Sequence, residues 1–344
     1  LISFFPFIPR LLQVRGKDIC ALNRRKHYSN VKGGFYVKWI IDADPGIDDA
    51  AAIIACLRLG LDVLGINVVH GNSPVEDTLR NALRLKDLLQ SEVPIYKGCG
   101  RAILEPQLNA TEVHGKDGLG DVDWPSLVSE PEEKHAVDML IEQSYIHSGN
   151  LGILAVGPLT NIALALIKDE TLSERVNELV IMGGTSGARG NTTIVGEFNF
   201  AADPEAAAVV LQSGIPITLV PWETCYHNLV TLEQLEQGGK EPLRNLVGEK
   251  FLEITAALFE RTRHNLGYPG LLLCDLIAAA VILDPEVVTE DLDVFAAVET
   301  SGVYGRGLTA IDYAGVTGNE PNVRLILQVD RERLGALLRR ALIV

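Results

Sequence analysis

Residues 40–49 read Ile-Ile-Asp-Ala-Asp-Pro-Gly-Ile-Asp-Asp and place four carboxylates close together, those of Asp42, Asp44, Asp48 and Asp49. An apolar run at 35–41 precedes them, and the apolar run 50–55 follows. The first run is typical of a buried strand and the second of a buried helix, so the acids are predicted on a strand-to-helix turn. In an open α/β sheet, such a turn lies at the carboxyl end of a strand, where these folds bind ligands.

Four neighbouring carboxylates repel one another, and this repulsion raises their pKa values. A bound cation would relieve it. Because every donor is an oxygen, Ca²⁺ or Mg²⁺ is favoured over zinc. The simpler alternative is an acidic helix start, in which Asp48 is the N-cap residue and Asp49 interacts with the helix dipole. That alternative explains only two of the four acids.

Outside this turn, apolar runs typical of strands alternate with stretches of helical periodicity. Strands are expected at 35–41, 63–69, 94–97, 151–156, 178–182, 217–221, 294–298 and 323–329. Helices are expected at 49–59, 75–89, 134–147, 160–167, 203–213, 241–263, 275–283 and 330–342. The alternation predicts a Rossmann-like α/β fold with a mainly parallel open sheet flanked by helices. No linker or charge block interrupts residues 34–344, so a single domain is expected there.

The composition limits the class, compartment and partners of the chain. Its 344 residues are 47% hydrophobic, which is typical of a globular protein with a large core. A net charge of −15 argues against nucleic acid as a partner. Five widely spaced cysteines without a CxxC pair favour a reducing compartment, the cytoplasm, over a disulfide framework or a zinc site.

Residues 1–33 differ in charge from the remainder. They hold seven Lys or Arg and one acid, whereas the rest of the chain holds 23 basic and 44 acidic residues. This basic extension is expected to be either an organelle-targeting leader or an unstructured segment. Its apolar opening, 1–12, is too short to span a bilayer, and no membrane association is expected.

Further polar groups fall on expected loops or strand ends. They are Asn72, the glycine-studded segment 114–120, Asn191 with the segment 197–199, and the pair Cys274 and Asp275. Each has a simpler interpretation: Asp275 as an N-cap, His114 as a loop residue, the asparagines as turn residues, and Cys274 as a small buried side chain. The segment 114–120 is expected to be irregular and mobile. Together these groups, with no evident arginine clamp, suit a neutral polyhydroxyl ligand better than a phosphate.

In this order, these segments resemble those of the inosine-uridine preferring nucleoside hydrolase family. The resemblance covers residues 36–340 and rests on the DxDPGxDD turn at 42–49, Val-His-Gly-Asn ending at Asn72, the segments 114–120 and 157–161, Met182-Gly-Gly, 197–199 and the helix at Asp275. It implies a calcium-dependent enzyme that hydrolyses the N-glycosidic bond of ribonucleosides to ribose and free base. Members of the family are usually homodimers or homotetramers.

The resemblance also implies roles for individual residues. Ca²⁺ would be held by Asp44, Asp49, Asp275 and the backbone carbonyl of Val156, and Asp44 would be the general base that deprotonates the metal-bound water. The substrate-binding residues would be Asp48, Asn72, Met182, Asn191, Glu197, Phe198, Asn199 and Asp275, the last of which is also one of the implied Ca²⁺ ligands. Asp48, the three asparagines, Glu197 and Asp275 would bind ribose hydroxyls, and Met182 would contact the sugar.

The sequence departs from the usual family pattern on the leaving-group side. Cys274 stands where many members have an active-site histidine, as in a separate subgroup of the family, and a thiol is a poor acid for so basic a leaving group. The acid could instead be His114 or one of the residues before Asp275, namely Arg261, Arg263, His264 and Tyr268. The segment 222–227 also lacks the usual aspartate. The sequence leaves the acid and the base preference open.

Two other interpretations compete with a nucleoside hydrolase. In a haloacid-dehalogenase-like phosphatase, Asp42 and Asp44 would be the nucleophile and the acid/base, but Gly46 stands where that motif has Thr or Val. In a non-catalytic relative, the chain would bind Ca²⁺ or a nucleoside without turnover, since a fold does not guarantee a function. An Asp44→Asn variant distinguishes this relative from a true hydrolase.

Overall fold

The computed structural model describes residues 37–104, 108–237, 243–267 and 270–344. Residues Val37–Val344 form one compact unit. The predicted basic extension 1–33 and the candidate acid Tyr268 lie outside the described residues. No described helix combines the length and the apolar character that crossing a membrane requires.

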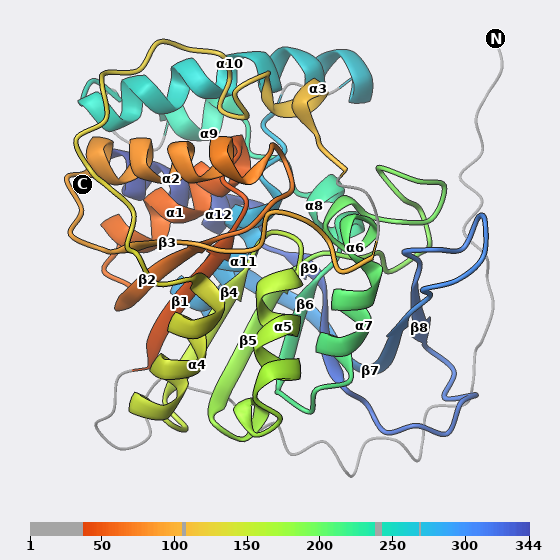
Figure 1. Ribbon diagram of the computed structural model, residues 1–344. Coiled ribbons are helices and arrows are strands. Elements are labelled where there is room, and N and C mark those ends of the chain that lie inside the picture. The colour runs from red at the N-terminus through yellow and green to blue at the C-terminus, as the bar shows by residue number, and fades with distance from the viewer. Residues whose placement is uncertain (1–36, 105–107, 238–242, 268–269) are drawn as a thin grey trace, which may run out of the picture. The chain divides into compact units, whose positions relative to one another are not determined.

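The described residues form one sheet of nine strands in the order β3-β2-β1-β4-β5-β6-β9-β7-β8 (Figure 1). The strands are β1 Lys38–Ala43, β2 Val63–Val68, β3 Ile95–Lys97, β4 Leu151–Ala155, β5 Val176–Met182, β6 Ile217–Val220, β7 Val288–Val298, β8 Thr309–Asp312 and β9 Val323–Val329. Every pair from β3 to β9 is parallel, and β7 runs antiparallel to both β9 and β8. The predicted mainly parallel α/β sheet is confirmed.

Helices cover both faces of this sheet. They are α1 Ile47–Arg58, α2 Val75–Leu89, α3 Thr111–His114, α4 Ala136–Ile146, α5 Thr160–Lys168, α6 Phe198–Ala202, α7 Pro204–Leu211, α8 Trp222–His227, α9 Leu232–Gln237, α10 Leu246–Leu266, α11 Cys274–Leu283 and α12 Arg331–Ile343, with 3-10 turns at Leu172–Glu174 and Pro285–Val287. Successive strand residues point to opposite faces. Accordingly, Ile41 packs in one core with α1, α11 and α12, whereas Ile40 packs in the other with α4, α5 and α7, which lie in front of the sheet in Figure 1.

The elements missing from the sequence-based expectation are short or solvent-facing. Helices α3, α6, α8 and α9 have four to six residues each, too few to establish a helical period. The first half of β7 is exposed and reads Val-Thr-Glu-Asp-Leu-Asp, so no apolar alternation marks it. β8 is a four-residue strand at the edge of the described sheet, where it pairs with β7.

The strand order reverses beside β1. β2 and β3 lie on one side of it, and β4, β5 and β6 lie on the other. In open α/β sheets, the crevice at such a reversal, at the carboxyl ends of the strands, is where ligands bind. Asp42 of β1 pairs with Ala155 of β4. The residues that follow this pair, from Ala43 and from Val156 onward, therefore both lie at the crevice.

Candidate active site

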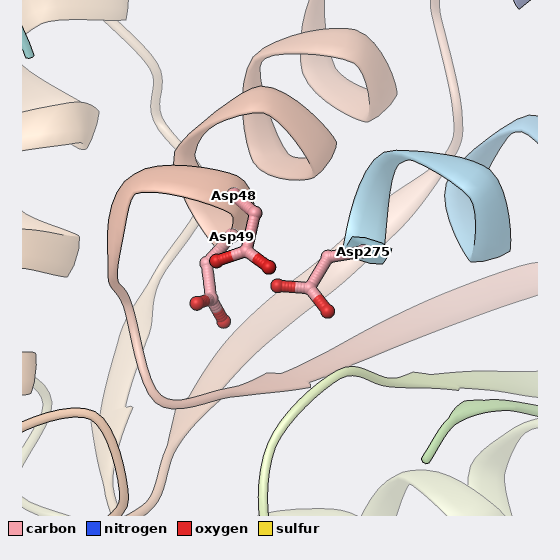
Figure 2. Close-up of side chains that lie close together, drawn as sticks. All are labelled: Asp48, Asp49 and Asp275. Atoms are coloured by element: carbon pink, nitrogen blue, oxygen red, sulfur yellow. The ribbon is translucent and has the colours of Figure 1, made fainter. Parts of the chain in front are cut away.

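Three carboxylates from two helix starts meet in the crevice. Asp48 and Asp49 lie in the first turn of α1, and Asp275 lies in the first turn of α11, which packs against α1. One oxygen from each carboxylate lies within 4.8 Å of the other two, and Figure 2 shows the Asp275 side chain pointing toward Asp48 and Asp49. Asp49 and Asp275 are buried, and Asp48 is half-buried. The structure thus unites acids that are more than 220 positions apart in the sequence.

Asp44 follows β1 and is fully buried between two loops. The Asn72 backbone N–H donates to its Oδ2 at 2.7 Å. A Cβ on Gly71 would lie 1.9 Å from that oxygen, and one on Gly157 would lie 2.7 Å from Oδ1. Only glycine therefore lets the loops after β2 and β4 close around this carboxylate.

Asn72 ties the acidic turn together. Its Nδ2 donates to the carbonyl oxygen of Asp44 at 3.1 Å and to Asp49 Oδ2 at 3.0 Å. The Gly46 backbone N–H donates to the same Asp49 oxygen at 2.9 Å. In contrast, Asp44 Oδ1 and Asp49 Oδ1 are buried without a hydrogen-bond partner among the described residues. Each carboxylate therefore has one oxygen fixed by the protein and one left for a ligand.

The electrostatics of the cluster favour a bound cation. Burial, followed by the charge of Asp48, raises the pKa of Asp49 to about 8. Burial also raises the pKa of Asp44, with a further contribution from the Asp49 charge, and burial and the Asp48 charge do the same for Asp275. A divalent ion would offset this desolvation and repulsion, and a cluster of carboxylate oxygens suits a hard ion. These residues therefore fit a metal ion.

The second wall of the crevice comes from β5 and α6. Glu197 is the N-cap of α6: its Oε1 accepts from Asn199 N at 2.9 Å, and its Oε2 accepts from Gly184 N at 2.7 Å. Asn199 Nδ2 donates to the carbonyl oxygens of Val156 and Met182, both at 3.1 Å. A carbonyl oxygen has two lone pairs, so Val156 keeps one for a ligand. Burial raises the pKa of Glu197 to about 7, although the backbone N–H bonds oppose that shift.

A cavity of about 340 Å³ joins these two walls. Twelve of the residues predicted from the sequence line it: Asp48, Asn72, His114, Val156, Met182, Asn191, Glu197, Phe198, Asn199, Arg261, Cys274 and Asp275. Asp44 and Asp49 are fully buried beside them. His264 and Arg263 have exposed side chains and do not line this cavity.

Several lining residues could not be recognised in the sequence. Arg189, in the loop after β5, and Leu258, in α10, both line the cavity. Arg261, which the sequence offered as a candidate acid, lines the cavity as well, so two arginines line it although no arginine clamp was evident from the sequence. The guanidinium carbon of Arg189 lies 5.1 Å from the ring centre of Tyr226 in α8. Tyr226 belongs to the segment 222–227, which lacks the family's usual aspartate, and it forms part of the cavity wall. Their positions cannot be read from the sequence, because the loop of Arg189 and the helices α8 and α10 reach the cavity only through tertiary packing.

His114 ends the short helix α3 instead of lying in an irregular loop, so that expectation was wrong for this residue. Its Nδ1 accepts the Ile47 backbone N–H at 3.1 Å, which leaves Nε2 to carry the hydrogen of the neutral ring. Burial lowers the pKa of His114; the Asp48 charge opposes this shift, and the Arg261 charge adds to it. Beyond His114, the Asp117 carboxylate accepts Leu119 N–H at 2.8 Å and pairs with Arg84 at 2.8 Å.

Cys274 lines the cavity as a buried thiol. Its interaction with Cys225, together with burial, raises the pKa of Cys274 well above its usual value. The thiol therefore stays protonated at neutral pH. The four cysteines in the described ranges, Cys56, Cys99, Cys225 and Cys274, are free thiols.

Comparison with known proteins identifies the family. Residues 39–336 match the family model of the inosine-uridine preferring nucleoside hydrolases. The chain is 37% identical over 292 residues to the non-specific ribonucleoside hydrolase RihC of Salmonella paratyphi A, covering 85% of this chain and 93% of that protein. It is 34% identical over 308 residues to the pyrimidine-specific ribonucleoside hydrolase RihA of Klebsiella pneumoniae, covering 88% and 97%. The chain belongs to the inosine-uridine preferring nucleoside hydrolase family.

Solved structures agree with this assignment. A plant nucleoside hydrolase superimposes with a TM-score of 0.81 at 30% identity, covering 89% of this chain and 98% of its own. The purine-preferring ribonucleoside hydrolase from Gardnerella vaginalis also gives 0.81, at 29% identity and coverages of 89% and 100%. The family predicted from the motifs is therefore confirmed, and the phosphatase alternative is wrong.

Proposed function

We propose that this protein is a calcium-dependent ribonucleoside N-ribohydrolase. The observation that carries the proposal is the convergence of Asp48, Asp49 and Asp275 beside the cavity, in a chain of this family. The Asp44, Asp49 and Asp275 carboxylates and the Val156 carbonyl would hold Ca²⁺. The ion would lower the pKa of the attacking water and neutralise the buried charges.

Asp44 is the proposed general base. Its Oδ2 is fixed by the Asn72 N–H, while Oδ1 is unpaired among the described residues and can accept a proton from water. The proposed partners of the ribose hydroxyls are Asp48, Asn72, Asn191, Glu197, Asn199 and Asp275, with Met182 and Phe198 against the sugar. Cleavage of a glycosidic bond passes through an oxocarbenium-like state, which this acidic surrounding stabilises.

On the leaving-group side we favour His114 and Arg261 over Cys274 and His264. Both favoured residues line the cavity, and both have N–H donors: His114 through Nε2, and Arg261 through its guanidinium. Cys274 also lines the cavity, but its raised pKa makes it a poorer acid. The exposed His264 lies outside the lining. Hydrogen bonds from His114 and Arg261 would stabilise the negative charge that develops on the departing base.

The leaving-group assignment predicts a dependence on the substrate. His114→Ala and Arg261→Ala should each lower kcat for a natural ribonucleoside by about 100-fold, the usual scale of acid catalysis. The same variants should lose far less activity on a nitrophenyl riboside, because nitrophenolate departs without a proton. Arg263→Ala is the matched control, since Arg263 is exposed and pairs with Glu260 on its own helix. Equal losses on both substrates would remove His114 and Arg261 from this role.

Release of free ribose tests the function itself. We expect ribose from at least one of inosine, uridine, cytidine, adenosine and guanosine, loss of that activity with a calcium chelator, and its return when Ca²⁺ is added back. The panel also defines the base preference, because the similar RihC and RihA are named for different preferences. If Ca²⁺ binds but no ribonucleoside is cleaved, the non-catalytic relative is the correct interpretation.

The proposal also covers the partner, the oligomeric state and the compartment of the enzyme. The partner is a small ribonucleoside, and the acidic chain does not suit nucleic acid. A homodimer or homotetramer is proposed from the family resemblance. A reducing, cytoplasmic compartment is proposed because the five cysteines of the sequence are widely spaced and form no CxxC pair.

A further inference from the structure

Three buried polar side chains form a hydrogen-bonded network outside the cavity lining. His70 follows β2, Thr160 begins α5, and Asp203 caps α7. His70 Nε2 lies 3.1 Å from Thr160 Oγ1, and Thr160 Oγ1 lies 2.6 Å from Asp203 Oδ2. All three residues are at most 1% exposed, and none of them lines the cavity. This network therefore joins three segments without contributing to the lining of the cavity.

In this network each residue donates to the next, from His70 through Thr160 to Asp203. Asp203 accepts Ile103 N–H on Oδ2 at 3.0 Å and Ala206 N–H on Oδ1 at 3.1 Å, as expected of a carboxylate. It therefore also accepts the single hydrogen of the Thr160 hydroxyl, so the hydroxyl must accept from His70 Nε2–H. Burial lowers the pKa of His70 to about 4, in keeping with a neutral ring. Asp203 thus fixes both the rotamer of Thr160 and the tautomer of His70.

His70 begins the loop that closes on Asp44. Its backbone N–H donates to the Cys99 carbonyl at 2.9 Å, and the next residue, Gly71, has no room for a Cβ beside Asp44 Oδ2. The residue after that, Asn72, donates its backbone N–H to the same oxygen at 2.7 Å. A small shift of His70 would therefore move the Asn72 N–H that holds Asp44 Oδ2.

We propose that the Asp203–Thr160–His70 chain is a positioning network that holds the loop 70–72 so that Asp44 is aligned for proton transfer. This inference rests on the proposed role of Asp44. The three residues touch no substrate and act only through the backbone of the loop. A misplacement of about 1 Å can lower the rate roughly 100-fold, so even a small loss of anchoring should be measurable.

Thr160→Val tests the network, because valine keeps the β-branched shape and removes only the hydroxyl. For the folded, Ca²⁺-loaded enzyme we expect kcat to fall roughly 10- to 100-fold with little change in KM. Thr160→Ser, which restores the hydroxyl, should return most of kcat. Thr218→Val is the matched control, since Thr218 is a buried threonine of β6 whose hydroxyl bonds to Glu178 away from the site. It should keep the wild-type kcat.

His70→Phe is the second variant, and it keeps the ring volume without the Nε2–H donor. Circular dichroism and gel filtration give the folded fraction, to which each kcat is normalised. A lower melting temperature with an unchanged normalised kcat would overturn the proposal, as would equal losses in Thr160→Val and Thr160→Ser. A wild-type enzyme that cleaves no ribonucleoside would instead contradict the proposed function. A loss of kcat in Thr160→Val and His70→Phe, restored by Thr160→Ser, is the result that supports the network.

Discussion

Asp44→Asn is expected to lower kcat by about 10³-fold, within the range that a general base contributes. Asparagine has nearly the same shape and keeps an oxygen that can accept the Asn72 N–H, which is 2.7 Å from Asp44 Oδ2 in the wild type. It cannot take a proton from water. Asp49, Asp275 and the Val156 carbonyl would still be present to bind Ca²⁺, so affinity should weaken less than turnover. Steady-state kinetics at saturating Ca²⁺, with calorimetry for ion binding, measures both effects.

The control for this variant is Asp138→Asn, which removes one carboxylate from α4, where Asp138 pairs with Lys168 on the surface. It should leave kcat and Ca²⁺ binding unchanged. If Asp44→Asn kept more than about a tenth of the wild-type kcat, another group would have to be the base. If it lost activity only because it bound no Ca²⁺ at any accessible concentration, the ligand role of Asp44 alone would account for the loss, and the variant would give no support to the base role.

The centre of the site could be predicted from the sequence because its information is local. The four acids of the turn lie next to one another between two apolar runs, and the position of a strand-to-helix turn in an α/β sheet follows from general topology. The structure places β1 at the reversal of strand order, with β4 beside it. Asp275 is different: alone it reads as an N-cap, and only the family resemblance connected it with Asp49.

The surroundings of the site could not be predicted, because they depend on packing between distant segments. Arg189 reaches the cavity from a loop, and Leu258 from a helix face. Nothing near either residue in the sequence indicates that position. The same holds for His70, Thr160 and Asp203, which lie 90 and 43 positions apart along the chain of hydrogen bonds. Thr160 and Asp203 each stand at a helix start, where a capping role is the ordinary interpretation.

A 2′-deoxyribonucleoside is expected to be a far poorer substrate than the matching ribonucleoside, with kcat/KM lower by about 10⁴-fold. The proposed ribose site contains buried or half-buried groups, among them Asp48, Asn72 and Asp275, that need a hydroxyl partner. When the 2′-hydroxyl is absent, at least one of these groups loses its partner and does not regain water, so the desolvation cost is not recovered. The measurement compares kcat/KM for the two substrates under the same Ca²⁺ concentration.

A variant at the site identifies the source of that discrimination. Asp48 is suited to this test because it lines the cavity and is not one of the proposed Ca²⁺ ligands; since its carboxylate belongs to the cluster beside the ion, the variant is measured at saturating Ca²⁺. Asp48→Ala should lower kcat/KM for the ribonucleoside much more than for its 2′-deoxy analogue, so the ratio between them shrinks. Asp138→Asn, which removes a surface carboxylate of α4 outside the cavity lining, should leave the ratio unchanged. An unchanged ratio in Asp48→Ala would mean that Asp48 does not bind the 2′-hydroxyl. Comparable rates for both substrates in the wild type would mean that the site does not recognise that hydroxyl, because a buried polar group left without a partner costs free energy.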